Sequence, residues 1–325
     1  WYIQLLKMIM QRLGVGYAAR AVSYAGHGVD SDVVLGSNIQ DNRTGDKKIA
    51  WTVNGQIDHK IEWVDLVTME FLYDRSEMVT IDGDTDTTST IDTTILPEFI
   101  FISHSIGAHL VQRLCILRKD VLVRTRAIIH LMPFFRFDPY PRWKNSVLST
   151  IANAPDISLG ILQTTSKIAS FLPKKMIDMY LENIAGISVQ EDRELARGLL
   201  TNPDYARNFL TLGMEEIRDL PAKHDTGALK IIGEHSPSYI LYCGNVDQWA
   251  PKFHIEEMHQ SIKTGITPNN ITLAYVDELQ HDFVVYPDMH GPVVDFAYAS
   301  ISHANSLREQ EGAKSSNKIH LTSKL

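Results

Sequence analysis

The stretch that most constrains the fold of this chain is Ser103-His104-Ser105-Ile106-Gly107. Before it, residues 98–102 are mostly apolar and aromatic, which predicts a buried strand; after it, apolar residues recur at helical spacing as far as Arg118. A serine at a sharp turn between a strand and a helix is typical of a nucleophile elbow, with an ordinary loop serine as the alternative. Such a turn needs small residues two positions before and after the serine. Gly107 meets this need, and Ser103 stands where a glycine is usual.

An elbow of this kind also supplies hydrogen-bond donors for a developing negative charge. It lifts the Ser105 hydroxyl above the sheet and points the Ile106 N–H and the helix N-terminus at the oxyanion. We expect His104 to point elsewhere and to be structural. The second oxyanion donor normally comes from a loop after an earlier strand. Because the chain opens at Trp1 inside a predicted helix, we expect that donor and the N-terminal strands of the fold to be missing.

The composition is that of an ordinary globular protein. With 325 residues, 44% of them hydrophobic and 22% charged, the chain is long enough for one large α/β domain with insertions. Its formal net charge of -8 argues against a nucleic-acid partner. Cys115 and Cys243 are predicted to be buried and unpaired. The 13 histidines show no metal-ligand spacing, so we expect neither a metal nor a cofactor.

The order of predicted elements indicates the α/β class, with a mostly parallel sheet and crossover helices. Besides 98–102, strands are predicted at 18–24, 127–132, 239–244 and 271–276, and helices at 2–13, 53–71, 252–262 and 292–307. Residues 1–133 and 230–307 are assigned to this core. The helical pattern of residues 134–229 predicts a cap over the site. Residues 82–94 are expected to be a solvated insertion, and residues 308–325 a disordered tail.

Two further residues strengthen the case for the elbow. Asp247 follows a predicted strand beyond the cap, and His281 follows the last predicted strand. A serine, an acid and a histidine in this order, each at the carboxyl end of a parallel strand, are typical of the α/β-hydrolase fold. His281 would take the proton of the Ser105 hydroxyl, and Asp247 would orient the imidazole and stabilise its charged form. Asp277 and Asp282 are rival acids, which we expect to be solvated in the loop.

Aromatic residues cluster where the cap segment begins, at Phe134, Phe135, Phe137, Tyr140 and Trp143. The plainer interpretation of this cluster is that it packs the cap on the sheet. The sharper interpretation is a surface that contacts lipid, because aromatic side chains are favoured where protein meets a membrane interface.

Four motifs, taken together, carry a family resemblance. They are Tyr24-Ala25-Gly26-His27-Gly28, the elbow, Gly244-Asn245-Val246-Asp247-Gln248-Trp249 and the more specific Asn54-Gly55-Gln56-Ile57-Asp58-His59-Lys60. Over residues 1 to 306 the chain resembles the lipid droplet-associated hydrolase family. It departs from the family pattern at Ser103, in the insertion at 82–94, and in lacking the glycine-rich loop that holds the second oxyanion donor.

The resemblance implies a serine hydrolase of the α/β-hydrolase fold, with Ser105, Asp247 and His281 as the triad. It would cleave lipid esters, such as sterol esters or acylglycerols, through an acyl-enzyme at the lipid droplet surface, which it would contact through the cap. A weakly active or non-catalytic lipid-storage protein is one alternative. The C-terminal Ser323-Lys324-Leu325 matches a peroxisomal address for an import receptor, so a peroxisomal hydrolase of acyl esters or thioesters is another.

Overall fold

The computed structural model of the chain describes residues 2–22, 52–80, 96–137, 155–185, 187, 190–243, 247, 250–265 and 270–322. Several predicted features lie outside these residues: the glycine turn at 24–28, the insertion at 82–94, Tyr140, Trp143 and the C-terminal Ser323-Lys324-Leu325. Within the described residues, no helix is both long and apolar enough to cross a membrane.

The core of the molecule is a parallel sheet whose four strands pair in the order in which they occur along the chain. The strands are β1 (Phe99–His104), β2 (Thr125–Leu131), β3 (Ser238–Cys243) and β4 (Ile271–Val276). β2 and β3, in the middle of the sheet, are almost fully buried, which is typical of a parallel sheet that is covered on both faces, whereas the outer strands β1 and β4 are partly exposed. Because all strands run the same way, the residues that follow β1, β3 and β4 lie at one edge, where Ser105, Asp247 and His281 are found.

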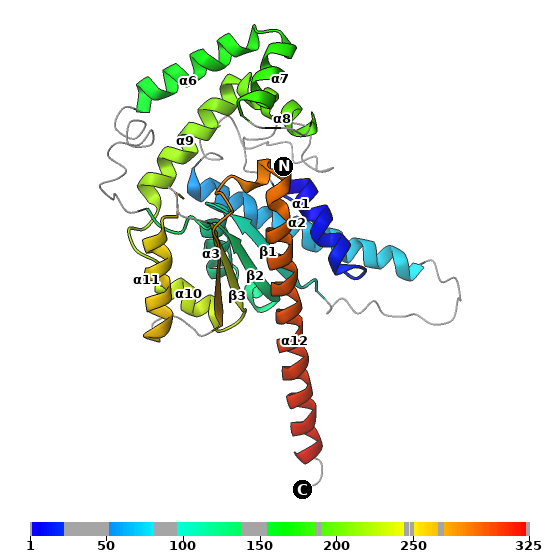
Figure 1. Cartoon of the computed structure of the whole chain (residues 1–325). Coiled ribbons are helices and arrows are strands. Elements are labelled where there is room, and N and C mark those ends of the chain that lie inside the picture. The colour runs from blue at the N-terminus through cyan, green and yellow to red at the C-terminus, as the bar shows by residue number, and fades with distance from the viewer. Residues whose placement is uncertain are drawn as a thin grey trace.

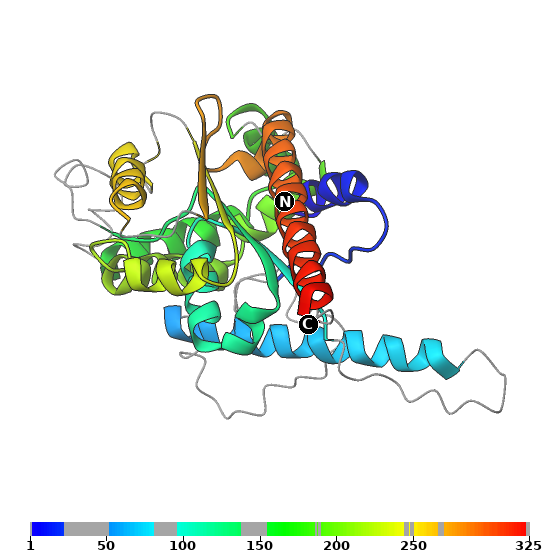
Figure 2. The same ribbon diagram turned by 90° about the horizontal axis from the view of Figure 1, so that it is seen from below.

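Helices cover both faces of the sheet. Residues that alternate along a strand point to opposite faces, so Ile129 packs towards α1 (Tyr2–Leu13) and α12 (His290–Thr322), while its neighbour Ile128 packs towards the opposite layer. That second layer contains α2 (Val53–Thr80), α3 (Gly107–Leu117), α10 (Thr226–Gly233) and α11 (Lys252–Lys263). Figure 2 shows α1 and α12 on one side of the sheet and α2 on the other.

The long segment between β2 and β3 is helical, as the sequence pattern indicates. It contains α6 (Pro155–Ser170), α7 (Lys174–Asn183), α8 (Gln190–Leu200) and α9 (Pro203–Asp219) before α10. In Figure 1 these four helices gather beyond the end of the sheet at which α12 begins. Leu212 of α9 packs with Val53, Ile57 and Leu110, so α9 connects this group of helices to α2 and α3.

Two predicted elements are wrong. Residues 18–22 form no strand, and alanines, which favour strands poorly, make up most of them. The tail predicted to be disordered from residue 308 is instead a continuation of α12 as far as Thr322. Good helix formers such as Arg308, Glu309 and Gln310 extend a helix that packing has already nucleated. α2 likewise continues beyond the predicted end at Phe71.

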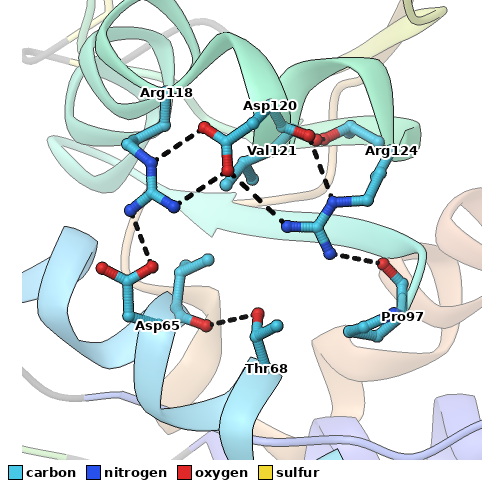
Figure 3. Close-up of polar contacts among 9 residues, drawn as sticks. Asp65, Thr68, Pro97, Arg118, Asp120, Val121 and Arg124 are labelled. Carbon is cyan, nitrogen blue, oxygen red and sulfur yellow. Dashed lines mark hydrogen bonds and ion pairs between the residues drawn. The ribbon is translucent and has the colours of Figure 1, made fainter. Parts of the chain in front are cut away.

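A polar cluster fixes the far end of α3 to its surroundings (Figure 3). The Arg118 guanidinium lies 2.9 Å from the Asp120 carboxylate, at the start of α4 (Lys119–Val123), and 2.7 Å from Asp65 of α2. Arg124 donates to the carbonyl oxygen of Pro97, just before β1. These contacts connect α3, the helix that follows the elbow, to α2 and to the segment just before β1.

Candidate active site

The backbone at Ser105 has the strained geometry of a nucleophile elbow. Its φ of 53° lies in the left-handed region, which a residue with a Cβ rarely adopts and which costs about 1–2 kcal/mol. Three hydrogen bonds hold it: Ser105 N–H donates to Leu131 O at 3.2 Å, and Ser105 O accepts from the N–H groups of Ala108 and Phe134 at 3.0 Å each. The turn is therefore fixed by both β2 and α3.

Ser103, which stands where a nucleophile elbow usually has a glycine, is accommodated by a buried polar contact. Its hydroxyl lies 2.7 Å from Nδ1 of His130, its register partner on β2. Burial lowers the pKa of His130 to about 3, so this imidazole is neutral. The substitution thus adds a hydrogen bond between β1 and β2 under the elbow.

The structure brings Ser105, His281 and Asp247 together in one hydrogen-bonded chain. His281 Nε2 lies 2.8 Å from Ser105 Oγ, and His281 Nδ1 lies 2.8 Å from Asp247 Oδ2. The Asp247 side chain is 2% exposed and that of His281 is 17% exposed. Because an ionised carboxylate only accepts, Nδ1 carries the proton of the neutral imidazole and Nε2 is left to accept from the serine hydroxyl.

Asp247 accepts hydrogen bonds from at least three of the described residues, and these donors keep it ionised. Besides His281, the Ala250 N–H donates to Oδ1 at 3.0 Å and the Cys243 thiol donates to Oδ2 at 3.1 Å. Burial on its own favours the neutral acid, but these donors outweigh it and hold the pKa of Asp247 below its ordinary value. A buried anion therefore faces His281 at any pH near neutrality.

The two rival acids do not take this position. The hydrogen bond of His281 Nδ1 goes to Asp247, while the Asp277 side chain is hydrogen-bonded to Tyr275. In the described part of the chain, Cys243, Asp247 and His281 form the one group of ligand atoms close enough to hold a metal ion. Their atoms are already joined to one another by hydrogen bonds, the arrangement of a proton-transfer chain.

The helix end next to Ser105 presents a backbone N–H at the side of the serine. Ile106 stands at the N-terminus of α3, and its N–H has no hydrogen-bond acceptor among the described residues. Its side chain is buried against Phe134 and Leu220, which fixes the peptide in place. A free N–H at a helix N-terminus beside the serine is suited to bind a negatively charged oxygen.

Comparison with known families decides the assignment. The profile of the lipid-droplet associated hydrolases matches residues 1–284. The chain belongs to this family. Its parallel sheet, elbow and order of site residues are those of the α/β-hydrolase fold. No curated protein matches the chain.

Solved structures resemble the chain only distantly. They include an acid deformylase from Pseudomonas putida S16, with 14% identity over 61% of this chain and 66% of that one, and a TM-score of 0.40. A hydrolase from Oleispira antarctica has 16% identity over 64% of each chain, with a TM-score of 0.38. A haloalkane dehalogenase variant from Bradyrhizobium elkanii has 11% identity over 82% and 78%, with a TM-score of 0.44. The chain spans just under two thirds of the first two proteins.

Sequence reasoning missed two residues that contact the site. Cys243 was predicted only to be buried, which is confirmed, but its thiol also donates to Asp247. Its position, at the end of β3 and four residues before Asp247, is the signal that could have found it. Tyr2 donates to His104 Nδ1 at 2.6 Å although the two residues are 102 positions apart in the sequence, a contact that no local pattern indicates.

Of the predicted aromatic cluster at the start of the segment between β2 and β3, the structure describes Phe134, Phe135 and Phe137. Phe134 is 1% exposed and packs on Ile106, and Phe135 is also buried. Phe137 is half-buried. The packing interpretation is therefore right for Phe134 and Phe135, and the lipid interpretation is wrong for them.

Proposed function

We propose that the chain is a serine hydrolase that cleaves carboxylic esters of lipids at a lipid surface. The observation that carries this proposal is the pair of 2.8 Å hydrogen bonds that link Ser105, His281 and Asp247. A serine hydroxyl is a poor nucleophile until a base removes its proton. An imidazole oriented by a buried carboxylate is such a base.

The reaction follows from these positions. Ser105 Oγ attacks the ester carbonyl carbon while its proton passes to His281 Nε2. The oxyanion that forms accepts from the Ile106 N–H, and the charged imidazole is stabilised by Asp247. Collapse of this intermediate expels the alcohol, which takes the proton from His281, and leaves an acyl-enzyme. Water then attacks the acyl group with His281 again as the base, which releases the acid and restores Ser105.

The exposed faces of α6 and α7 support a lipid surface as the place of action. Large apolar side chains stand in solvent on both helices and on the turn between them, at Ile157, Ile161, Ile168, Phe171, Leu172, Met176, Met179, Tyr180 and Ile184. We call these residues the apolar ridge. Phe171, at the turn, is 87% exposed. Many large apolar side chains exposed on neighbouring segments of the chain are typical of sites that bind a membrane or a partner.

The charges around the apolar ridge favour a phospholipid-coated surface over a protein partner. Lys167 and Lys175 are exposed along it, and so is Lys174, which lies 3.7 Å from the Glu194 carboxylate of α8. The acidic side chains of α7 form ion pairs with α8: Asp178 pairs with Arg197, and Glu182 pairs with Arg193. Cations beside an apolar face are the arrangement that binds anionic head groups while the apolar side chains enter the acyl region.

A fluorophosphonate probe, which reacts with activated serines, tests the chemistry. We expect the chain to be labelled, Ser105→Ala to be unlabelled, and the control Ser170→Ala, at an exposed serine of α6, to be labelled like the wild type. Circular dichroism checks that each variant is folded. A folded wild-type chain that takes no label contradicts the hydrolase and leaves a non-catalytic lipid-storage protein as the conclusion.

Flotation with phospholipid-coated triacylglycerol droplets tests the surface. We expect the double variant Phe171→Asp and Met179→Asp to lose droplet binding. Val123→Asp is the control and should retain binding, because Val123 is an apolar residue whose exposure lies between those of Phe171 and Met179 but which belongs to α4, outside the apolar ridge. Hydrolysis of droplet-bound sterol ester or acylglycerol should fall with binding, and hydrolysis of a short water-soluble ester should not. A preference for soluble acyl thioesters, with no gain from the interface, contradicts this assignment.

A further inference from the structure

His104, the residue before the serine, contacts the loop that carries His281. Its Nε2–H donates to the main-chain carbonyl oxygen of His281 at 2.7 Å. The two imidazole rings lie 5.0 Å apart, and the edge of the Phe283 ring, two residues further along the loop, meets the His104 ring at 5.3 Å. His104 therefore contacts both the main chain of His281 and the ring of Phe283 in the same loop.

The His281 carbonyl decides which nitrogen of His104 carries the proton, and a third residue, Tyr2, meets the other nitrogen. Since the carbonyl of His281 can only accept, the proton sits on Nε2, and Nδ1 is free to accept from the Tyr2 hydroxyl at 2.6 Å. Burial, aided by the neighbouring His281, lowers the pKa of His104 to about 3, so the ring stays neutral. Two hydrogen bonds thus connect Tyr2 of α1, through His104 at the end of β1, to the loop after β4.

From this geometry we infer that His104 is a positioning residue for the catalytic base of the proposed reaction. Two anchors then define where His281 Nε2 stands: Asp247 orients the ring through Nδ1, and His104 fixes the main chain from which the ring projects. Without the second anchor, the loop shifts and the 2.8 Å approach to Ser105 Oγ lengthens. A misplacement of about 1 Å at a reacting group lowers rates on the order of 100-fold.

Two substitutions separate positioning from packing. His104→Phe keeps an aromatic ring against Phe283 but removes the donor. His104→Gln loses the ring but keeps an N–H close to the position of Nε2. We expect His104→Phe to lower kcat and the rate of probe labelling about 10- to 100-fold with KM unchanged, because both ring nitrogens of His104 are hydrogen-bonded within the protein, to Tyr2 and to the main chain of His281. His104→Gln should restore most of the rate, even where its melting temperature is the lower of the two.

The inference rests on the proposed function, and the outcomes keep the two apart. A wild-type chain that takes no label overturns both. A labelled wild type with His104→Phe equally fast overturns the positioning role alone, as does His104→Gln being no faster than His104→Phe. Tyr2→Phe, which removes only the donor to Nδ1, should slow labelling about 2- to 10-fold; a loss as large as that of His104→Phe would place the anchor on Tyr2 instead.

Discussion

Replacement of Asp247 by asparagine probes the site most directly, because the structure dictates how the new amide must sit. The Ala250 N–H donates to Oδ1, so the amide oxygen of an asparagine is held at that position. Its NH2 group then takes the place of Oδ2, facing His281 Nδ1. A donor there can only be met by an unprotonated Nδ1, which moves the imidazole proton to Nε2. In that tautomer His281 cannot accept the proton of Ser105.

We therefore expect Asp247→Asn to lower kcat on the order of 10⁴-fold, which corresponds to about 5.4 kcal/mol of transition-state stabilisation. The assay is ester hydrolysis together with the rate of fluorophosphonate labelling. Asp282→Asn, beside His281 but outside this hydrogen-bonded chain, is the matched control and should stay near the wild-type rate. A folded Asp247→Asn protein that keeps more than a tenth of the wild-type rate would refute the tautomer reasoning and Asp247 as the acid.

Two further predictions concern stability. Burial raises the pKa of Glu216 on α9 from its ordinary value of 4.5 to about 8. Between pH 4.5 and pH 8 the folded protein therefore keeps a proton that the unfolded chain has released. The free energy of unfolding falls as the pH rises through this range. Glu216→Gln removes this titration, so its free energy of unfolding should rise relative to that of the wild type by up to about 1.4 kcal/mol for each pH unit between about pH 5 and pH 8. Urea titrations measure this difference. A difference that does not depend on pH would contradict the reasoning. Arg118→Gln removes partly exposed ion pairs with Asp65 and Asp120, so we expect a loss of at most about 1 kcal/mol that shrinks in 0.5 M salt, and a loss above about 2 kcal/mol would show that the cluster is more than a surface network.

The elbow and the order of the site residues were predictable because local chemistry specifies them. The apolar run from Phe99 to Ile102 favours a strand, in which Phe99 is buried and the next three residues are half-buried; Gly107 permits the turn, and the strands before Asp247 and His281 are short apolar runs between polar loops. In a parallel sheet, position at the end of a strand is enough to place a residue at the shared edge.

The contacts that refine the site depend on tertiary structure and left no pattern in the sequence. Tyr2 and His104 meet because α1 packs beside α12 over the sheet. Which apolar residues of α7 are exposed could not be predicted either, because such residues occupy both faces of the helix. Ile177 and Leu181 are buried, whereas Met176 and Met179 are exposed. Hydrophobic periodicity identifies a helix, but it cannot tell a buried stripe from one that stands in solvent.

The pairing of β2 with β3 across more than a hundred intervening residues has a consequence for how such a protein can change. The entropy of closing a loop grows only with the logarithm of its length, so a loop of this size costs about 2 kcal/mol more than one of a dozen residues. The length of the segment from α6 to α9 can therefore vary at little cost, as long as a residue such as Leu212 still packs on α2 and α3. Ser105, Asp247 and His281 all follow strands of the sheet, so an exchanged segment would bring a new surface to the same chemistry, and the two properties can evolve separately.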